Sequence, residues 1–178
     1  MFGEFNTACG LPTSAIQLSS EVTKPVPDEE HLHVLGATMT ITADGENTNG
    51  EFSVMDMLAP PGFENGLHTH GPAEIFHVID GEMLLHVDGE TQYLSAGMTG
   101  HVSANVPHGM RVEGDDVLRV LIVMMPAGAE DFFRAVGEPS DSRHLPEPRD
   151  VTDADLEVLF AIGEEHGFEF LGPLPTDA

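Results

Sequence analysis

Short apolar runs separated by glycine-containing turns dominate the middle of this chain. Examples of these runs are EIFHVI, EMLLHV and VLRVLIVMM, which are rich in apolar and β-branched residues. Asp80-Gly81 and Asp88-Gly89 each lie between two such runs, where a tight hairpin turn needs a positive φ. Many short strands at this spacing predict a β-sandwich or barrel rather than a parallel sheet. The predicted strand regions are 31–43, 51–59, 74–79, 82–87, 91–94, 99–104, 109–113 and 117–125.

After Pro126 the period of the pattern changes from that of strands to that of helices. The segment GAEDFFRAV predicts a short helix that ends at Gly137, and a proline-rich surface stretch follows it. Thr152 and Asp155 have the spacing of a capping box, and Gly167 ends the helix that they begin. One face of this second helix is expected to hold Leu156, Leu159, Phe160 and Gly163.

These patterns divide the chain into three parts: an N-terminal arm (1–30), a β-barrel core (31–125) and a helical extension (126–178) that packs on the barrel. The N-terminus has no positive segment followed by an apolar run, so we expect no signal peptide, and no apolar run reaches the length of a membrane span. Cys9 is the single cysteine, which excludes an intrachain disulfide; we expect an idle thiol there rather than a nucleophile.

The charge balance excludes whole classes of partner. The chain has 31 acidic and 6 basic residues, for a net charge of −25, whereas binding to nucleic acids or anionic membranes needs basic patches. The acids are interleaved with apolar residues, which favours a folded protein over an acidic disordered chain. At about 1 M ionic strength the screening length is about 3 Å, which removes most self-repulsion. We therefore predict a protein of the high-salt cytoplasm of a halophile.

Four side chains form a candidate metal site. His68 and His70 are two residues apart, so on a strand both imidazoles point to the same face. Glu74 begins the next strand after a short bend, and His108 stands at the start of a later strand. Three imidazoles and one carboxylate suit a divalent transition metal (Fe, Mn, Ni, Co, Cu or Zn) rather than Mg²⁺ or Ca²⁺.

The spacing of these residues resembles the first motif of the cupin superfamily. That motif is a glycine, five residues, His-x-His, three or four residues, Glu, six residues and a glycine. Here it is met by Gly62, His68, His70, Glu74 and Gly81. The second motif is matched by Gly97 and His108, whereas three of its positions differ. The residues that depart from it are Ser103, Asn105 and Val112, in place of proline, glycine and asparagine.

The resemblance implies a double-stranded β-helix, or jelly roll, with a metal inside the barrel and a short helical appendix at the C-terminus. A looser likeness to single-domain cupins of the quercetin 2,3-dioxygenase group extends over nearly the whole chain, including the tail HGFEFLGPLP. It implies a metal-dependent dioxygenase that uses O₂ to open an enolisable aromatic ring with release of carbon monoxide. In that interpretation Glu74 is the catalytic base that takes the proton of the substrate hydroxyl.

Two other functions remain open at this stage. One is a different cupin enzyme, either another small-molecule dioxygenase or an isomerase, and the other is a cupin that binds a metal or ligand without turnover. We expect a homodimer, because jelly-roll sheets with apolar outer faces commonly pair.

An apolar substrate pocket is expected beside the metal. Alternation from Glu74 places Phe76 and Val78 inward, and alternation from His108 does the same for Met110. Met55 and Met57 are further candidates on a strand whose inward face the sequence leaves undetermined. The other histidines have no assigned role, although His101 is a candidate for a supporting position near the metal.

Overall fold

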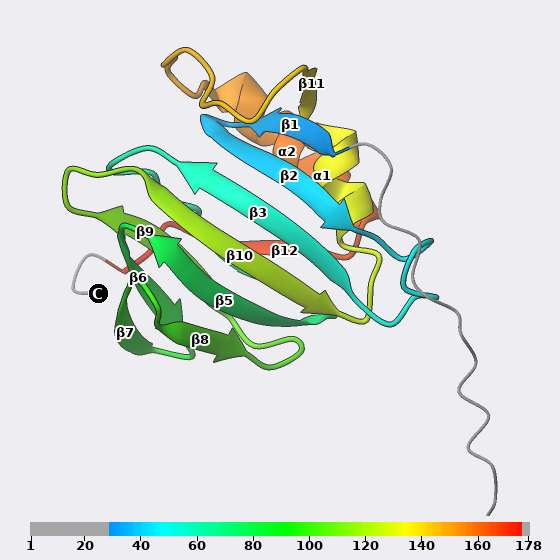
Figure 1. Ribbon diagram of the computed structural model, residues 1–178, viewed down its shortest axis with the longest axis horizontal. Helices are drawn as coiled ribbons and strands as arrows, with labels where there is room; N and C mark the ends of the chain where they lie inside the picture. Colours follow the sequence, from blue (N-terminus) through cyan, green and yellow to red (C-terminus); the bar gives the residue numbers. More distant parts are fainter. Residues whose placement is uncertain (1–28, 176–178) are drawn as a thin grey trace, which may run out of the picture.

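Two antiparallel sheets face each other in the computed structural model, which describes residues 29–175 (Figure 1). The first sheet has seven strands, in spatial order β11 (Glu138–Ser140), β1 (Glu30–Val34), β2 (Ala37–Ala43), β3 (Ser53–Ala59), β10 (Leu118–Met125), β5 (Ala73–Asp80) and β8 (Thr99–Val102). The second has five strands, in the order β12 (Glu169–Gly172), β4 (Leu67–Thr69), β9 (His108–Glu113), β6 (Glu82–Val87) and β7 (Glu90–Ser95). This is the jelly-roll architecture that the sequence predicts.

The core lies between the inner faces of the two sheets. It is built by the alternate residues of each strand, as the period of a half-buried strand requires. Buried side chains of the seven-stranded sheet include Met55, Met57, Phe76, Val78 and Ile122, and those of the five-stranded sheet include Met83, Leu85, Met110 and Val112.

The segment 31–43, predicted as one strand region, is a hairpin of two strands. The chain reverses at Leu35 and Gly36, which have φ values of 46° and 96°, and β1 and β2 then pair antiparallel. The positive φ at a leucine is sterically unfavourable, so the local sequence carries little signal for a turn there. The pairing of β1 with β2 and β11 offsets this cost.

The two predicted helices are present. They are α1 (Glu130–Val136), followed by Gly137, and α2 (Asp153–Glu165). Thr152 caps α2: its hydroxyl accepts from the N–H of Asp155, whose side chain accepts from the N–H of Thr152. Figure 1 shows both helices beside β1 and β2, at one end of the larger sheet.

The C-terminal extension is also part of both sheets. β11 pairs with β1 in the seven-stranded sheet, and β12 pairs with β4 in the five-stranded sheet. The sequence predicted a surface crossing and a tail in these places. The N-terminal arm and Cys9 lie outside the described residues, apart from residues 29 and 30.

Glu130 connects α1 to the loop after β2. It is only 2% exposed, and its carboxylate accepts hydrogen bonds from the backbone N–H groups of Gly45 (2.8 Å) and Gly128 (2.7 Å). Burial by itself raises the pKa of this carboxyl, but hydrogen bonds from backbone N–H groups outweigh burial and hold the pKa below its ordinary value.

Replacing Glu130 with alanine is expected to lower the free energy of unfolding by about 2–3 kcal/mol, because two N–H groups lose a charged acceptor. A carboxyl whose pKa is lower in the folded state stabilises the fold above its unfolded pKa of about 4.3, and the effect is lost as pH falls through the folded pKa. The difference in free energy of unfolding between the unmodified protein and Glu130→Ala, measured by urea unfolding, should therefore shrink as the pH falls below about 4.3. The neighbouring Asp131→Ala, at an exposed position, serves as the control and should change stability by less than about 1 kcal/mol.

Candidate metal centre

The three motif histidines and Glu74 come from strands of both sheets. His68 lies on β4 and directly opposes His108, the first residue of the neighbouring strand β9. His70 follows β4, two residues after His68, and Glu74 lies on β5 of the other sheet. The centre therefore spans the inside of the barrel between the two layers.

The ligand atoms of the three histidines converge, and the Glu74 carboxylate contacts two of them. The ligand atoms of His68, His70 and His108 lie within 4.8 Å of one another. The Oε2 atom of Glu74 is 3.1 Å from Nε2 of His70 and 3.0 Å from Nε2 of His108. All four side chains are buried, with exposures of 1% for His108 to 7% for His68. The structure thus brings together all four residues that the motifs predict.

Backbone carbonyls fix the tautomer of each imidazole. The Nδ1 atoms of His68, His70 and His108 lie 2.8, 3.0 and 2.8 Å from the carbonyl oxygens of Gly66, Pro72 and Val106, in that order. A carbonyl oxygen only accepts, so Nδ1 carries the proton in each ring. A neutral ring then has its lone pair on Nε2, which is the atom that faces the centre in His70 and His108.

The chemistry of this donor set fits a cation. In the neutral tautomers, the Nε2 atoms of His70 and His108 are acceptors, and they face the Glu74 carboxylate, which is also an acceptor. Such an arrangement is stable only with positive charge between the acceptors, supplied by protons on Nε2 or by a metal ion. Imidazole nitrogen with carboxylate oxygen is a ligand set that favours divalent transition metals.

Two of the four groups have strongly shifted pKa values. Burial, together with the nearby His108, lowers the pKa of His68 to about 4, so its ring is neutral at pH 7 and able to bind a metal. Burial alone raises the pKa of Glu74, but hydrogen bonds from His108 and His70 outweigh it and lower the pKa to about 2. Glu74 is therefore a carboxylate at neutral pH.

One departure from the second motif has a clear structural explanation. Asn105 stands where the motif has glycine, and its φ is 60°, in the left-handed region that asparagine tolerates better than most residues. Its backbone N–H donates to the carbonyl oxygen of His70 at 2.9 Å. The asparagine therefore keeps the turn that ties the second motif to the first.

The predicted pocket residues are all buried in the barrel. Phe76, Val78, Met110, Met55 and Met57 have exposures of 4% or less. The burial of Met55 and Met57 shows which face of β3 points toward the core, a question that the sequence left undetermined. Their contact with a substrate stays a prediction.

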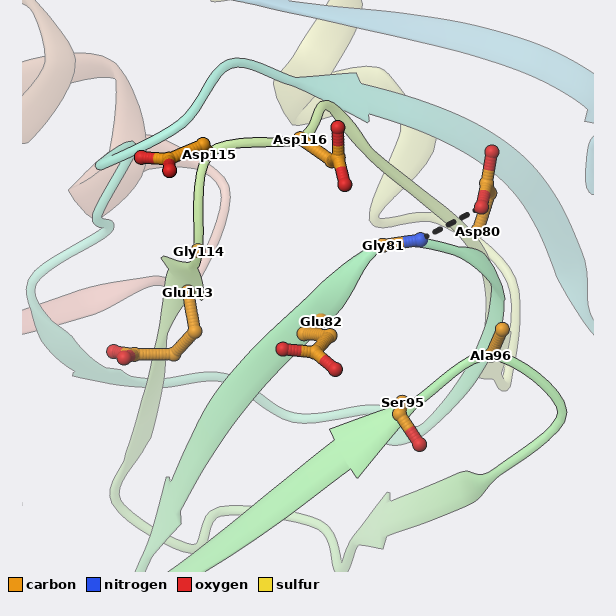
Figure 2. A pocket seen from close by; sticks show the side chains of 9 residues that line it. All are labelled: Asp80, Gly81, Glu82, Ser95, Ala96, Glu113, Gly114, Asp115 and Asp116. Atoms are coloured by element: carbon orange, nitrogen blue, oxygen red, sulfur yellow. Dashed lines mark hydrogen bonds between the residues drawn. The ribbon is translucent and has the colours of Figure 1, made fainter.

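Two surface cavities lie away from His68, His70 and His108. One, of about 310 Å³, is formed where the β5–β6, β7–β8 and β9–β10 connections meet. Figure 2 shows the carboxylates around it, from Asp80, Glu82, Glu113, Asp115 and Asp116. The other, of about 480 Å³, lies between the β1–β2 hairpin and α2.

The remaining histidines on strands near the motifs lie outside the centre. His77 is exposed and contacts the Thr99 hydroxyl at 2.8 Å, and His86 is buried on β6 beside Thr91. His101, a candidate for a supporting position near the metal, is exposed and pairs with Ile75, so it does not hold that position: alternation on β8 turns it to the outer face.

Two aromatic residues beside the histidines have no counterpart in the sequence prediction. Phe168 lies with its ring centroid 5.0 Å from that of His70, and Phe170 lies 6.1 Å from His68. Both belong to the C-terminal tail. The only sequence signal was the alternation in FEF, which is too short to predict a strand.

Comparison with known proteins finds similarity to cupins. A family model described as "Cupin domain" matches residues 55–124. A quercetin 2,3-dioxygenase of Bacillus subtilis (strain 168) is 32% identical over 107 residues, which are 60% of this chain and 32% of that protein. The chain thus spans about a third of the length of this curated relative.

Two solved structures share the fold. An RmlC-like cupin from Shewanella frigidimarina has a TM-score of 0.53 and 24% identity, over 64% of this chain and 96% of that one. A cupin-like protein from Thermotoga maritima has a TM-score of 0.52 and 15% identity, over 83% of this chain and 84% of that one. Between residues 29 and 175, no helix is both long enough and apolar enough to cross a membrane.

Proposed function

We propose that this chain, which matches a cupin-domain model over residues 55–124 and is similar to a quercetin 2,3-dioxygenase, is a metal-dependent dioxygenase acting on a flavonol-like aromatic. The observation that carries the proposal is the convergence of three carbonyl-oriented imidazoles with one buried carboxylate. The substrates are O₂ and a small enolisable aromatic molecule.

His68, His70 and His108 would hold one divalent transition metal through Nε2. Their Nδ1–H groups remain bound to backbone carbonyls, which fixes the tautomer and the orientation of each ring. When bound, the metal supplies Lewis acidity that lowers the pKa of a substrate hydroxyl group. Metals compatible with this ligand set are Fe, Mn, Ni, Co, Cu and Zn.

Glu74 is proposed as the base that takes the hydroxyl proton. It is a carboxylate at neutral pH, and it lies within 3.1 Å of two of the proposed ligands, so a group bound by them lies within its reach. The low pKa results from hydrogen bonds donated by His70 and His108. These donors are lost when Nε2 binds a cation, which leaves the carboxylate oxygen free to accept a proton from a bound hydroxyl group.

The apolar side chains next to these residues would hold the planar part of the substrate. Phe76 and Val78 follow Glu74 on the same face of β5, and Met110 follows His108 on β9. Met55 and Met57 extend the apolar surface on β3. Thioether side chains adapt to flat aromatic molecules, which favours this substrate class.

The proposal is tested with purified protein loaded in turn with each of the candidate metals. Metal content is measured first, and then O₂ uptake, carbon monoxide release and loss of flavonol absorbance under air. We expect all three signals from at least one metal form. Bound metal with no O₂ uptake from flavonols or other enolisable aromatics would overturn the dioxygenase assignment and favour an isomerase or a binding protein.

The conditions of this assay follow from the charge of the chain. Because the net charge is −25, we propose that the protein works at high salt, and the assay therefore uses molar KCl. We also propose that it is a homodimer. Sedimentation in the same buffer measures the oligomeric state. A monomer, or activity that falls steadily with added KCl, would contradict this part of the proposal.

A further inference from the structure

The C-terminal strand β12 holds the strand that carries His68. β4 has only three residues, and its register with β9 consists of the single pair His68–His108. On its other edge β4 pairs with β12, where Phe170 opposes His68 and Glu169 opposes Thr69. A three-residue strand with one such partner would be poorly fixed, so β12 supplies much of the backbone order of this ligand.

Aromatic rings from β12 and the residue before it lie against two of the histidine rings. Phe168, only 6% exposed, has its centroid 5.0 Å from that of His70 and 6.3 Å from that of His68. Phe170 lies 6.1 Å from His68. These are distances at which aromatic pairs attract each other. The hydrogen bonds to backbone carbonyls set the tautomer of the imidazoles, and the contacts with Phe168 and Phe170 limit the rotation of the imidazole rings.

Phe132 of α1 anchors this aromatic group. Its ring stacks on Phe168 with a centroid distance of 4.2 Å and an interplanar angle of 25°. Phe132 is itself buried, with 4% exposure. The contact to the histidines is therefore backed by a helix that packs on the barrel.

Three glycines leave the space in which the tail lies. A Cβ at Gly66, just before β4, would come 2.7 Å from the carbonyl oxygen of Gly172, and one at Gly109, next to His108, would come 2.7 Å from a methyl of Leu174. A Cβ at Gly163 of α2 would overlap the ring of Phe170. The tail is thus fitted closely to both strands that carry ligands.

From these contacts we propose that Phe168 and Phe170 are positioning residues of the metal centre, which set its affinity and geometry by holding the rings of His68 and His70. The proposal rests on the metal site of the proposed function, but not on the dioxygenase reaction. It makes the C-terminal tail, outside residues 55–124 that match the cupin domain, a structural part of the centre.

The test is Co²⁺ binding by the full chain, followed by competition with a chelator and by the visible absorption of the bound ion. We expect Phe168→Leu and Phe170→Leu each to weaken Co²⁺ binding about tenfold and to change its absorption spectrum, as loss of groups that orient ligands does. The matched control is Phe133→Leu, in the same aromatic cluster. The ring contacts of Phe133 among the described residues are with Phe132 and Phe168, at 5.2 and 6.4 Å, and not with His68 or His70. This variant should bind Co²⁺ like the unmodified protein.

A second variant, in α2, changes the position of Phe170 without altering Phe170 itself. A Cβ at Gly163 lies against Phe170 and Phe168 rather than against a proposed ligand, so Gly163→Ala displaces the Phe170 ring and should also weaken Co²⁺ binding and alter the spectrum. Thermal unfolding without metal shows how much each variant loses in general stability. A variant that loses only thermal stability, with unchanged Co²⁺ affinity and spectrum, would overturn the proposal.

The two proposals fail in different ways. Absence of O₂ uptake with normal Co²⁺ binding would remove the dioxygenase assignment, while weaker binding in the two phenylalanine variants would still support the positioning role. Equal Co²⁺ affinity in the unmodified protein and both phenylalanine variants would remove the positioning role and leave the dioxygenase intact. No Co²⁺ binding by the unmodified protein would overturn the positioning role together with the metal site.

Discussion

Replacing Glu74 with glutamine is expected to lower kcat for flavonol cleavage at least about 100-fold, the range in which loss of a general base falls. Glutamine keeps the shape of the side chain but does not accept the hydroxyl proton at neutral pH. The fold should persist, because Glu74 lies at the start of β5 and most of the core packing is on other residues. Steady-state O₂ uptake at saturating metal measures the effect.

The matched control for this variant is Glu64→Gln, the same chemical change at an exposed acid in the loop that precedes β4. It should leave kcat unchanged. Turnover at the normal rate in Glu74→Gln would exclude the role of Glu74 as a base. Loss of bound metal in that variant would instead assign the carboxylate to holding the ion, and metal analysis separates these two results.

Replacing His108 with alanine is expected to lower metal affinity at least about 100-fold, more than loss of an outer-shell partner typically costs. His108 is the least exposed of the proposed ligands at 1%, and it directly opposes His68 across β4 and β9. Metal content after dialysis against a weak chelator measures the loss.

His86 offers a control of the same residue type. It is also buried, at 7%, and lies on β6 opposite Gly109, the residue after His108, but its Nδ1 contacts Thr91 instead of the centre. His86→Ala should retain metal even if it loses stability. Equal metal retention by the two alanine variants would show that His108 is not a ligand.

The sequence alone determined the elements whose signals are local. Turns such as Asp88-Gly89, with φ values of 49° and 84°, and the capping box at Thr152 depend on a few adjacent residues. The period of two places His68 and His70 on one face wherever the strand lies. Together with the motif spacing, these rules predicted the fold class and the four residues that converge.

Other features depend on pairings between residues far apart in the chain. The inward face of β3 follows from its place between β2 and β10, which no local pattern of Val54, Met55 and Met57 specifies. The turn at Leu35 exists because β1 has partners on both edges.

Dependence on distant pairings also explains why the sequence does not predict the contact of the C-terminal tail with the metal centre. Phe170 opposes His68 only because β12 pairs with β4, about a hundred residues earlier in the chain, and that pairing is fixed by contacts with α1, α2 and the glycines that leave room for it. Local sequence sets backbone angles and side-chain period, and it thereby determined which residues are available as ligands. Only the tertiary structure decided what surrounds them, since packing across the barrel selects those neighbours.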